Sequence, residues 1–322
     1  AWGAVQGLMG LTTDAGPPLV QLDGPLTETV VVIVPVYNED PVTTCSRIAA
    51  MDESLQATGA AGQFHIAILS DTRNDAIAAR EKLWFLQMVE ERGAKGRMFY
   101  RRRADNRGKK AGNIEDFIQT SGGAYDLALI LDADSLMEGA TIVEMARRME
   151  AEQDIGLLQT LPVVTRASTR FGRAMQFSAA FHSPAFARGL AMMQGRSGPF
   201  WGHNAMVRVR AFAESCGLPE LKGKPPFGGH IMSHDYVEAA LLARAGWRVR
   251  LDDDLGGSFE EGPENLVDHA KRDRRWCQGN MQHLRLIEMP GLHPLSRFHL
   301  LQGAMAYLAS VWWLILLLLW AL

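Results

Sequence analysis

Short apolar runs alternate with longer amphipathic segments through the first half of the chain. Residues 30–34 form a continuous β-branched run, VVVIV, which is typical of a strand buried on both faces. Asp40 and Pro41 then have the residue types that favour a helix N-cap and the first helical position. Other strands are predicted at 65–69, 97–100 and 127–131, and helices at 75–91, 111–120 and 139–150. This alternation predicts an α/β fold with a doubly wound, mostly parallel sheet.

Acidic residues follow two of these predicted strands. Asp71 comes two residues after the strand at 65–69, and Asp132 and Asp134 follow the strand at 127–131. In doubly wound sheets, ligands bind at the carboxyl ends of the strands. If the strand stays extended, Asp132 and Asp134 point the same way and suit Mg²⁺ or Mn²⁺ bridging phosphate oxygens. The alternative is a turn in which the aspartates only accept backbone N–H bonds, but the accompanying Asp71 favours the metal site.

Six cationic side chains lie within residues 101–110, RRRADNRGKK. Such a run usually belongs to a solvated face or a nucleic-acid patch. Here Gly108 and Gly112 allow a tight turn, and a helix is predicted to begin at the end of the run, where its N-terminus and the lysines favour phosphate. The lack of interleaved aromatic residues argues against a single-strand nucleic-acid groove, and the net charge of −3 gives no general attraction to nucleic acid. We therefore expect a diphosphate beside the metal and no nucleic-acid partner.

The last 18 residues, 305–322, contain no charged side chain and include the run WLILLLLW. With apolar residues from just upstream, the segment is long enough for a membrane-spanning helix, and a buried core helix is the alternative. Because the chain begins with Ala1 and stops inside this segment, we expect a piece of a longer membrane protein. Residues 170–193 also carry apolar side chains at helical spacing, and there we favour an interfacial helix over a core helix.

Composition narrows the class of protein only slightly. Hydrophobic residues make up 47% of the chain, which excludes a disordered protein. Cys45, Cys216 and Cys277 are too few and too scattered for a disulfide framework, and with His269 and His283 they fit no zinc spacing. A reducing, cytoplasmic location is expected for most of the chain, and the first ten residues lack a secretory signal.

Several motifs, taken in order, resemble one family. VVIVPVYNE, SDT, RGKKAGN and LILDADS resemble the donor half of a family 2 glycosyltransferase with a GT-A, Rossmann-like nucleotide-sugar fold. FWGHN at 200–204 resembles the acceptor-side turn, SHD at 233–235 the triplet with the catalytic aspartate, and RRWCQGN at 274–280 the QxxRW motif of processive synthases. The longer segments RRRADNRGKKAGNIEDF and SHDYVEAALLARAGW are similar to the subfamily that builds the backbone of osmoregulated periplasmic glucans. The resemblance runs from 29 to 300 with two departures, since His234 replaces a Glu and Arg272 stands where QxxRW has Gln.

The resemblance implies a membrane-bound, inverting hexosyltransferase that uses UDP-glucose to build a β-glucan with β-1,2 linkages. Sugar transfer needs a stabilised leaving diphosphate and a base for the attacking hydroxyl, and one base without a second nucleophilic carboxylate implies single displacement with inversion. The implied metal ligands, for Mg²⁺ or Mn²⁺, are Asp132 and Asp134, and the implied general base is Asp235. The implied donor-binding residues are Pro35, Tyr37, Glu39, Asp71, Lys109, Lys110, Asn113, Asp132 and Arg275. The implied acceptor-binding residues are Gly202, His203, Asn204, His234 and Trp276.

These roles have plainer alternatives. Asp235 could be only a favourable charge at a helix N-terminus, Trp276 could be a core residue, and the cations of 272–275 could face anionic lipid. The chain could also be a non-processive family 2 transferase that adds one sugar to a lipid or protein acceptor, or a non-catalytic, membrane-tethered nucleotide sensor. A sensor would usually have lost Asp235 or one of the paired aspartates Asp132 and Asp134, and all three are present.

The predicted organisation has three parts. A linker at 1–28 follows upstream membrane segments, a catalytic domain occupies 29–290 with amphipathic, interfacial helices near its end, and a truncated transmembrane helix occupies 300–322. The implied partners are UDP-glucose, the growing glucan chain, the lipid bilayer and an acyl carrier protein. The implied location is the bacterial inner membrane, with several spans in the full-length protein and the catalytic domain on the cytoplasmic side.

Overall fold

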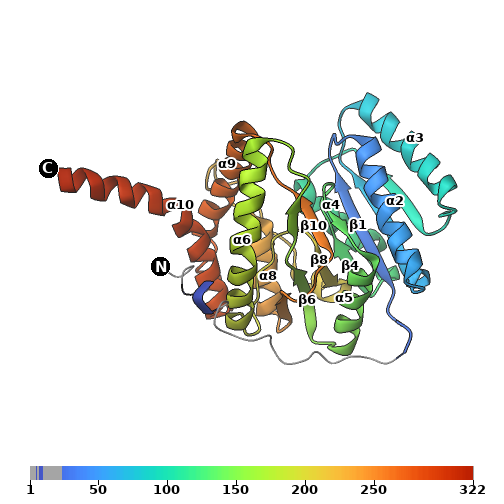
Figure 1. The fold of residues 1–322 in the computed structure, drawn as a ribbon. Coiled ribbons are helices and arrows are strands. Elements are labelled where there is room, and N and C mark those ends of the chain that lie inside the picture. The colour runs from blue at the N-terminus through green and yellow to red at the C-terminus, as the bar shows by residue number, and fades with distance from the viewer. Residues whose placement is uncertain (1–4, 6, 10–23, 322) are drawn as a thin grey trace.

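A seven-stranded, mostly parallel sheet forms the centre of the computed structural model, which describes residues 5, 7–9 and 24–321 (Figure 1). The strands lie in the order β3-β2-β1-β4-β8-β6-β9. Their bounds are β1 (Val30–Val36), β2 (Phe64–Ser70), β3 (Met98–Arg102), β4 (Leu127–Ile130), β6 (Ile155–Thr160), β8 (Ala205–Arg208) and β9 (Arg248–Asp252). Neighbouring strands are parallel except at β8, which is antiparallel to both β4 and β6. The predicted doubly wound, mostly parallel sheet is confirmed.

Helices cover both faces of this sheet, because successive side chains of a strand point to opposite faces. On β1, Val30, Val32 and Val34 pack in the cluster that includes side chains of α2, α3 and α5, whereas Val31 and Ile33 pack with α4, α7 and α8. The bounds of these helices are α2 (Pro41–Ala57), α3 (Asp75–Glu91), α5 (Gly139–Ala151), α4 (Lys109–Ser121), α7 (Val209–Ser215) and α8 (His234–Arg244). Two single turns, η1 (Ala61–Gln63) and η2 (Gly122–Ala124), complete this part. The prediction of a strand buried on both faces at 30–34 is confirmed.

Local signals fix where the helices begin. The Asp40 side chain accepts a hydrogen bond of 2.9 Å from the backbone N–H of Thr43, and Pro41 is the first residue of α2. This confirms the predicted cap, which satisfies an N–H that the first helical turn leaves unpaired. Helix α3 has the bounds predicted for it, and α5 begins at the predicted Gly139, whose backbone packs directly on Ser54 of α2.

A second, three-stranded sheet lies beside the first and was not predicted. It has the order β5-β10-β7, with β5 (Leu136–Met137), β10 (Ser258–Glu261) and β7 (Val163–Thr165). Strand β10 is antiparallel to β5 and parallel to β7. Because β5 follows β4 and β7 follows β6, the small sheet brings residues 258–261 to the carboxyl ends of the main strands.

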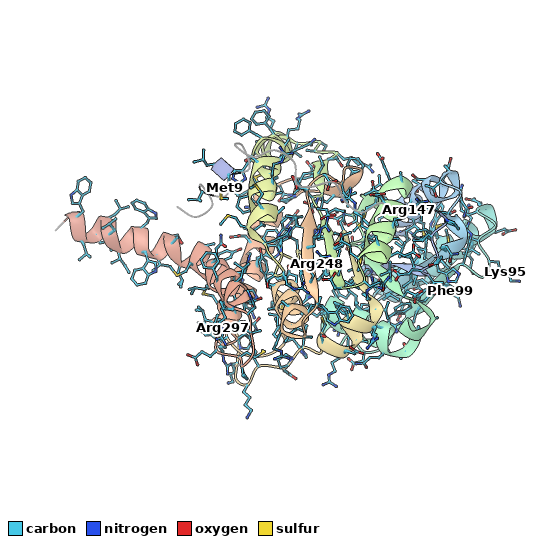
Figure 2. All side chains as sticks on the ribbon, turned by 90° about the horizontal axis from the view of Figure 1, so that it is seen from below. Met9, Lys95, Phe99, Arg147, Arg248 and Arg297 are labelled. Carbon is cyan, nitrogen blue, oxygen red and sulfur yellow. The ribbon has the colours of Figure 1, made fainter. Side chains whose placement is uncertain are left out.

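The C-terminal part consists of α6 (Arg170–Met193), α9 (Leu266–His283) and α10 (Pro294–Ala321). Helix α10 is the one helix in the described part of the chain that is long and apolar enough to cross a membrane. Its first turns pack on the protein through Ser296, Leu300 and Ala304, and the rest projects far from the body (Figure 1). Figure 2 shows side chains standing free around the projecting part, whereas Arg297 lies where the helix joins the protein. The predicted apolar helix is therefore present, and it begins at residue 294 instead of 300.

Helix α6 has the bounds of the predicted amphipathic segment. Ala187 and Leu190 are buried, whereas the Phe177 and Phe181 side chains are 74% and 83% exposed. The aromatic residues in the middle of the helix therefore face away from the protein core. Most of the predicted linker at 1–28 lies outside the described residues.

Candidate active site

Three loops meet at one edge of the main sheet because β1, β2 and β4 end side by side. Val36 of β1 pairs with Ser70 of β2, and Ile33 pairs with Ile130 of β4. The segments that follow, 37–40, 71–74 and 131–135, therefore lie together. A hydrogen bond joins the first two of these segments: the backbone N–H of Asn38 donates to Thr72 Oγ1 over 2.9 Å. Of the predicted donor residues here, Pro35 is half-buried at the end of β1, and Tyr37 is 52% exposed.

Asp132 and Asp134 lie in a tight turn. The expectation that the strand stays extended through them is wrong, because β4 ends at Ile130. The N–H of Ser135 donates to the Asp132 carbonyl over 3.1 Å, and the N–H of Asp132 donates to Ser135 Oγ over 3.0 Å. The turn still leaves the two carboxylates close enough to interact, since burial raises the pKa of Asp134 and the charge of Asp132 raises it further.

Excess negative charge gathers around this turn. Burial raises the pKa of Glu260, and the carboxylates of Asp134 and Asp132 raise it further. Glu39 behaves in the same way, with burial and the same two aspartates raising its pKa. Carboxylates that repel one another in this manner are relieved by a cation, and the donor set suits Mg²⁺ or Mn²⁺ held by few protein ligands together with phosphate oxygens. No group of three or more His, Cys, Asp or Glu side chains within the described ranges forms a metal cage by itself.

Lys110 connects the two halves of the site. Its Nζ forms an ion pair with Asp132 and donates to the Gly202 carbonyl over 2.6 Å. Burial alone would raise the pKa of Asp132, but Lys110 and, to a smaller extent, His203 outweigh it and lower the pKa to about 2. Asp132 is thus held ionised in spite of its acidic neighbours.

Other predicted donor residues are bound within the protein. The carboxylate of Asp71 is buried and accepts hydrogen bonds of 2.5 and 2.8 Å from Arg103. Asn113 is also buried; its side chain donates to the Leu69 carbonyl over 3.0 Å and accepts from Arg101 over 2.6 Å. These bonds tie α4 and the basic segment to the ends of β2 and β3. Much of the positive charge at 101–110 is therefore used in hydrogen bonds within the protein, and these bonds hold the loop in place.

The start of α4 has the tight turn that the sequence predicts. Gly108 precedes the helix with φ +69°, and a side chain at Gly112 would collide with the Arg107 carbonyl. Lys109 is the first helical residue, and its Nζ lies 3.4 Å from Met232 Sδ in the loop before α8. The lysines of this turn thus lie between the donor-side loops and the acceptor-side loop.

The segment 200–204, which the sequence predicts to be the acceptor-side turn, forms the loop before β8. Gly202 has φ +88°, and a Cβ built on it would lie 3.5 Å from Asp235 Cβ. His203 Nε2 lies 3.4 Å from Glu260 Oε2, so the turn also contacts β10. Asn204 is fully buried, and its amide donates to Ser258 Oγ over 2.8 Å. Asn204 therefore joins this turn to the small sheet.

Asp235 lies in the first turn of α8. Ser233 Oγ donates to Asp235 Oδ1 over 2.8 Å. The adjacent His234 is half-buried and pairs with Glu238, with 2.9 Å between Nδ1 and Oε2. Burial alone would lower the pKa of His234, but the Glu238 carboxylate outweighs it and raises the pKa above 6.5. His234 is thus paired with a carboxylate of its own helix, at the position where the family resemblance places a Glu.

Helix α9 contributes an aromatic side chain covered by a cation. The Arg272 guanidinium lies 4.4 Å from the centroid of the Trp276 ring, and Trp276 is 39% exposed. Burial raises the pKa of Asp134 and of Glu260, and the charge of Arg272 lies near enough to oppose part of this rise. Arg272 therefore faces the acidic turn. Arg275, the predicted diphosphate ligand, is exposed.

Glu260 is the residue of this site that sequence reasoning missed. It lies in SFEE, a segment without a strand-like apolar pattern and without a recognisable motif. From the sequence, Arg272 is a departure from QxxRW and part of a possible lipid-facing basic run, and its interaction with the acidic turn depends on how α9 packs.

Two family models match the chain. "Glycosyl transferase family 2" matches residues 31–215, and "Glycosyl transferase family group 2" matches residues 127–322. The chain is 70% identical over 314 residues to "Glucans biosynthesis glucosyltransferase H" of Cereibacter sphaeroides, covering 97% of this chain and 53% of that protein. It is 50% identical over 287 residues to the protein of the same name from Shewanella baltica, covering 89% of this chain and 40% of that protein. The chain thus spans about half the length of the curated relatives it matches.

The fold is similar to that of a solved glycosyltransferase. A mannosyltransferase from Pyrobaculum calidifontis, in complex with GDP-Man and Mn²⁺, superposes with a TM-score of 0.64 over 97% of this chain and 79% of that chain. The sequence identity is 18%, so this likeness concerns the fold alone.

Proposed function

Since this chain belongs to glycosyltransferase family 2, we propose that it is the catalytic part of a membrane-bound, inverting glucosyltransferase that uses UDP-glucose to build the backbone of osmoregulated periplasmic glucans. The motifs and the names of the two relatives support this substrate class. The observation that carries the proposal is the junction at Lys110. This residue joins Asp132 to Gly202, and Gly202 adjoins Asp235, so the diphosphate end lies beside the base.

The donor half of the site binds the UDP part of the sugar donor. Asp132 and Asp134 would hold the divalent cation, which supplies positive charge for the leaving diphosphate when it is bound. Lys110 and the N-terminus of α4 add further positive charge at the same place. The remaining donor contacts are assigned to Pro35, Tyr37, Glu39, Asp71, Lys109, Asn113 and Arg275. Arg103 holds the Asp71 carboxylate in place, and the assignment of Asp71 to uridine rests on the family resemblance.

The acceptor half removes the proton from the attacking hydroxyl. With Oδ1 bonded to Ser233, Asp235 has Oδ2 available on the side of Gly202. Asp235 takes the proton as the hydroxyl attacks the anomeric carbon, and UDP leaves from the opposite face, which inverts an α-linked donor into a β-linked product. The turn at Gly202, His203 and Asn204, with His234 and Trp276, forms the acceptor side. The β-1,2 linkage rests on the subfamily resemblance.

The membrane lies beside α6 and around the projecting part of α10 in this proposal. The exposed Phe177 and Phe181 of α6 and the apolar length of α10 support that placement. The full-length protein crosses the bacterial inner membrane several times, with this domain on the cytoplasmic side. An acyl carrier protein as a partner rests on the subfamily resemblance alone. A fluorophore attached at Phe181→Cys should be quenched by spin-labelled lipid, and no quenching would place α6 away from the bilayer.

The proposed reaction is tested by UDP release from the detergent-solubilised full-length protein across a panel of UDP-sugars, with and without Mg²⁺, and by sizing the products. We expect metal-dependent release from UDP-glucose together with a glucan polymer. Release with products of a single added sugar would instead identify a non-processive transferase. Binding of UDP-glucose without turnover by folded protein would identify a nucleotide sensor and leave Asp235 without its role.

A further inference from the structure

The C-terminal half of α9 carries two polar side chains that are fully buried. Gln282 and His283 both have 0% exposure, which is unusual for residues of these types. Their hydrogen-bond partners all lie in one segment, residues 228–233, which leads directly to Asp235. A buried polar side chain is stable only when it is bonded, so these bonds are part of the fold.

Gln282 holds the earlier part of this segment. Its Oε1 accepts from the N–H of Met232 over 2.9 Å. Its Nε2 donates to the carbonyls of Gly228 and His230, each over 3.1 Å. One side chain thus satisfies three backbone groups of a loop that has no regular structure of its own.

His283 holds the last residue before α8. Its Nε2 lies 3.0 Å from the Ser233 carbonyl, and because a carbonyl can only accept, Nε2 is the protonated nitrogen. The Ser233 hydroxyl in turn donates to Asp235 Oδ1 over 2.8 Å. A chain of two hydrogen bonds therefore runs from α9 through one serine to the proposed base.

The backbones are also in direct contact. A side chain at Gly279 of α9 would collide with the backbone nitrogen of Ser233. The segment before α8 therefore lies directly on the α9 backbone, with no side chain between them, and a shift of α9 must move it.

Helix α9 also packs on α10. A Cβ at Gly303 would collide with Asn280 Oδ1 and lie 3.7 Å from His283 Nδ1, which has no hydrogen-bond partner among the described residues. Further along, Tyr307 donates to Asp273 over 3.1 Å. Helix α9 thus lies between the apolar helix and the loop that carries the proposed base.

We propose that His283 is a positioning residue that orients Asp235 through Ser233, and that α10 sets this orientation by packing against α9 at Gly303. The inference rests on the proposed function. It makes the orientation of the base depend on how α10 is held, so the domain reaches its full rate only when α10 is correctly packed. The plain alternative is that His283 only fills space in the core between α8, α9 and α10.

The test compares His283→Gln with His283→Leu in the full-length membrane protein. The Gln amide can place a donor near the position of Nε2, whereas Leu fills a similar volume without any donor. We expect His283→Leu to lower kcat by about 10- to 100-fold, because a displacement of the base by about 1 Å can cost 100-fold. The KM for UDP-glucose should not change. His283→Gln should recover most of the rate, and hydrogen exchange of residues 228–235 should rise in the Leu variant alone.

Two further variants separate positioning from packing. Met149→Ala removes a fully buried side chain from a core cluster that contains no residue of α8, α9 or α10, so kcat should stay near wild type. Gly303→Ala places a methyl group against Asn280 Oδ1 and near His283 Nδ1, so the Asn280 side chain or α10 must shift; we expect a lower kcat with unchanged UDP binding. A wild-type rate in His283→Leu, or equal losses in the Gln and Leu variants, would overturn the inference. Absence of sugar transfer by the wild-type protein would instead overturn the proposed function. Hydrogen exchange of residues 228–235 in the His283 variants would then still test whether His283 of α9 holds this segment in place.

Discussion

Replacing Asp235 with Asn changes the chemistry of one oxygen while keeping the shape of the side chain. The Asn carbonyl oxygen can still accept the hydrogen bond that Ser233 donates to Oδ1. The atom that replaces Oδ2, on the side of Gly202, becomes an NH₂ group that cannot take a proton. Asp235→Asn therefore removes the base without removing the bond that holds it.

The expected size of the effect follows from the neighbours of Asp235. A positioned general base contributes about 10²- to 10⁴-fold to the rate. The neighbouring titratable groups on α8, His234 and Glu238, are paired with each other over 2.9 Å, so neither is free to replace Asp235 as the base. We therefore expect the upper part of the range, a loss of about 10³- to 10⁴-fold in kcat, which corresponds to about 4–5.5 kcal/mol of transition-state stabilisation.

The assay is UDP release at saturating UDP-glucose and Mg²⁺, with UDP affinity measured separately by calorimetry. UDP affinity should be unchanged in Asp235→Asn, because the donor residues remain in place. Asp75→Asn, a change to an exposed carboxylate at the start of α3, is the matched control and should keep the wild-type rate. If Asp235→Asn kept more than a tenth of the wild-type kcat, Asp235 would not be the base.

Three further outcomes are expected. Asp52→Ala should reduce the free energy of unfolding by about 3–5 kcal/mol in urea titrations, because it leaves Arg92 and Arg97 without the buried carboxylate that pairs with them. Burial alone would raise the pKa of Asp52, but these arginines hold it below 3.8. The ion pairs therefore stabilise the folded protein fully above about pH 4, and this stabilisation is lost as the pH falls through the pKa of Asp52 in the folded state. The free energies of unfolding of the variant and the wild type should consequently converge in acid. Arg272→Gln should lower the KM for the acceptor by about twofold to fivefold, since it removes the cation from the Trp276 face, and an unchanged KM would mean that the sugar does not stack there. Asp134→Asn should abolish Mn²⁺ binding in the presence of UDP. It should also raise the melting temperature of the metal-free protein, because burial and the charge of Asp132 both disfavour the ionised form of Asp134. A lower melting temperature would contradict this electrostatic account.

Much of the fold could be predicted because local signals agree with the tertiary structure. The β-branched run at 30–34 is a strand that is buried on both faces, and the Asp40–Pro41 cap begins α2 as predicted. Helices α3 and α6 have their predicted bounds, and each begins directly after a capping residue, Asn74 or Thr169, whose side chain accepts a hydrogen bond from the first helical turn. Strand β1 continues past the predicted residue 34 to Val36.

Interactions between distant segments could not be predicted in the same way. The small sheet depends on pairing between Phe259 and residues about 100 positions away, and a four-residue strand with two glutamates carries no local signal. The proximity of Asp132 and Asp134 was anticipated, but for the wrong geometric reason, since a turn and not an extended strand brings them together. The ion pair between Arg103 and Asp71 could also be recognised only from the structure.

The antiparallel strand in the middle of the main sheet has a consequence for synthesis of the protein. Strand β4 can pair with β1 once residue 130 has emerged, but its other edge has no partner until β8 is made about 75 residues later. At about 5–20 residues per second, this edge of fully buried apolar residues stays open for about 4–15 s on the ribosome. Nascent chains that stop between residues 131 and 204 should therefore be the most prone to aggregate and the most dependent on chaperones.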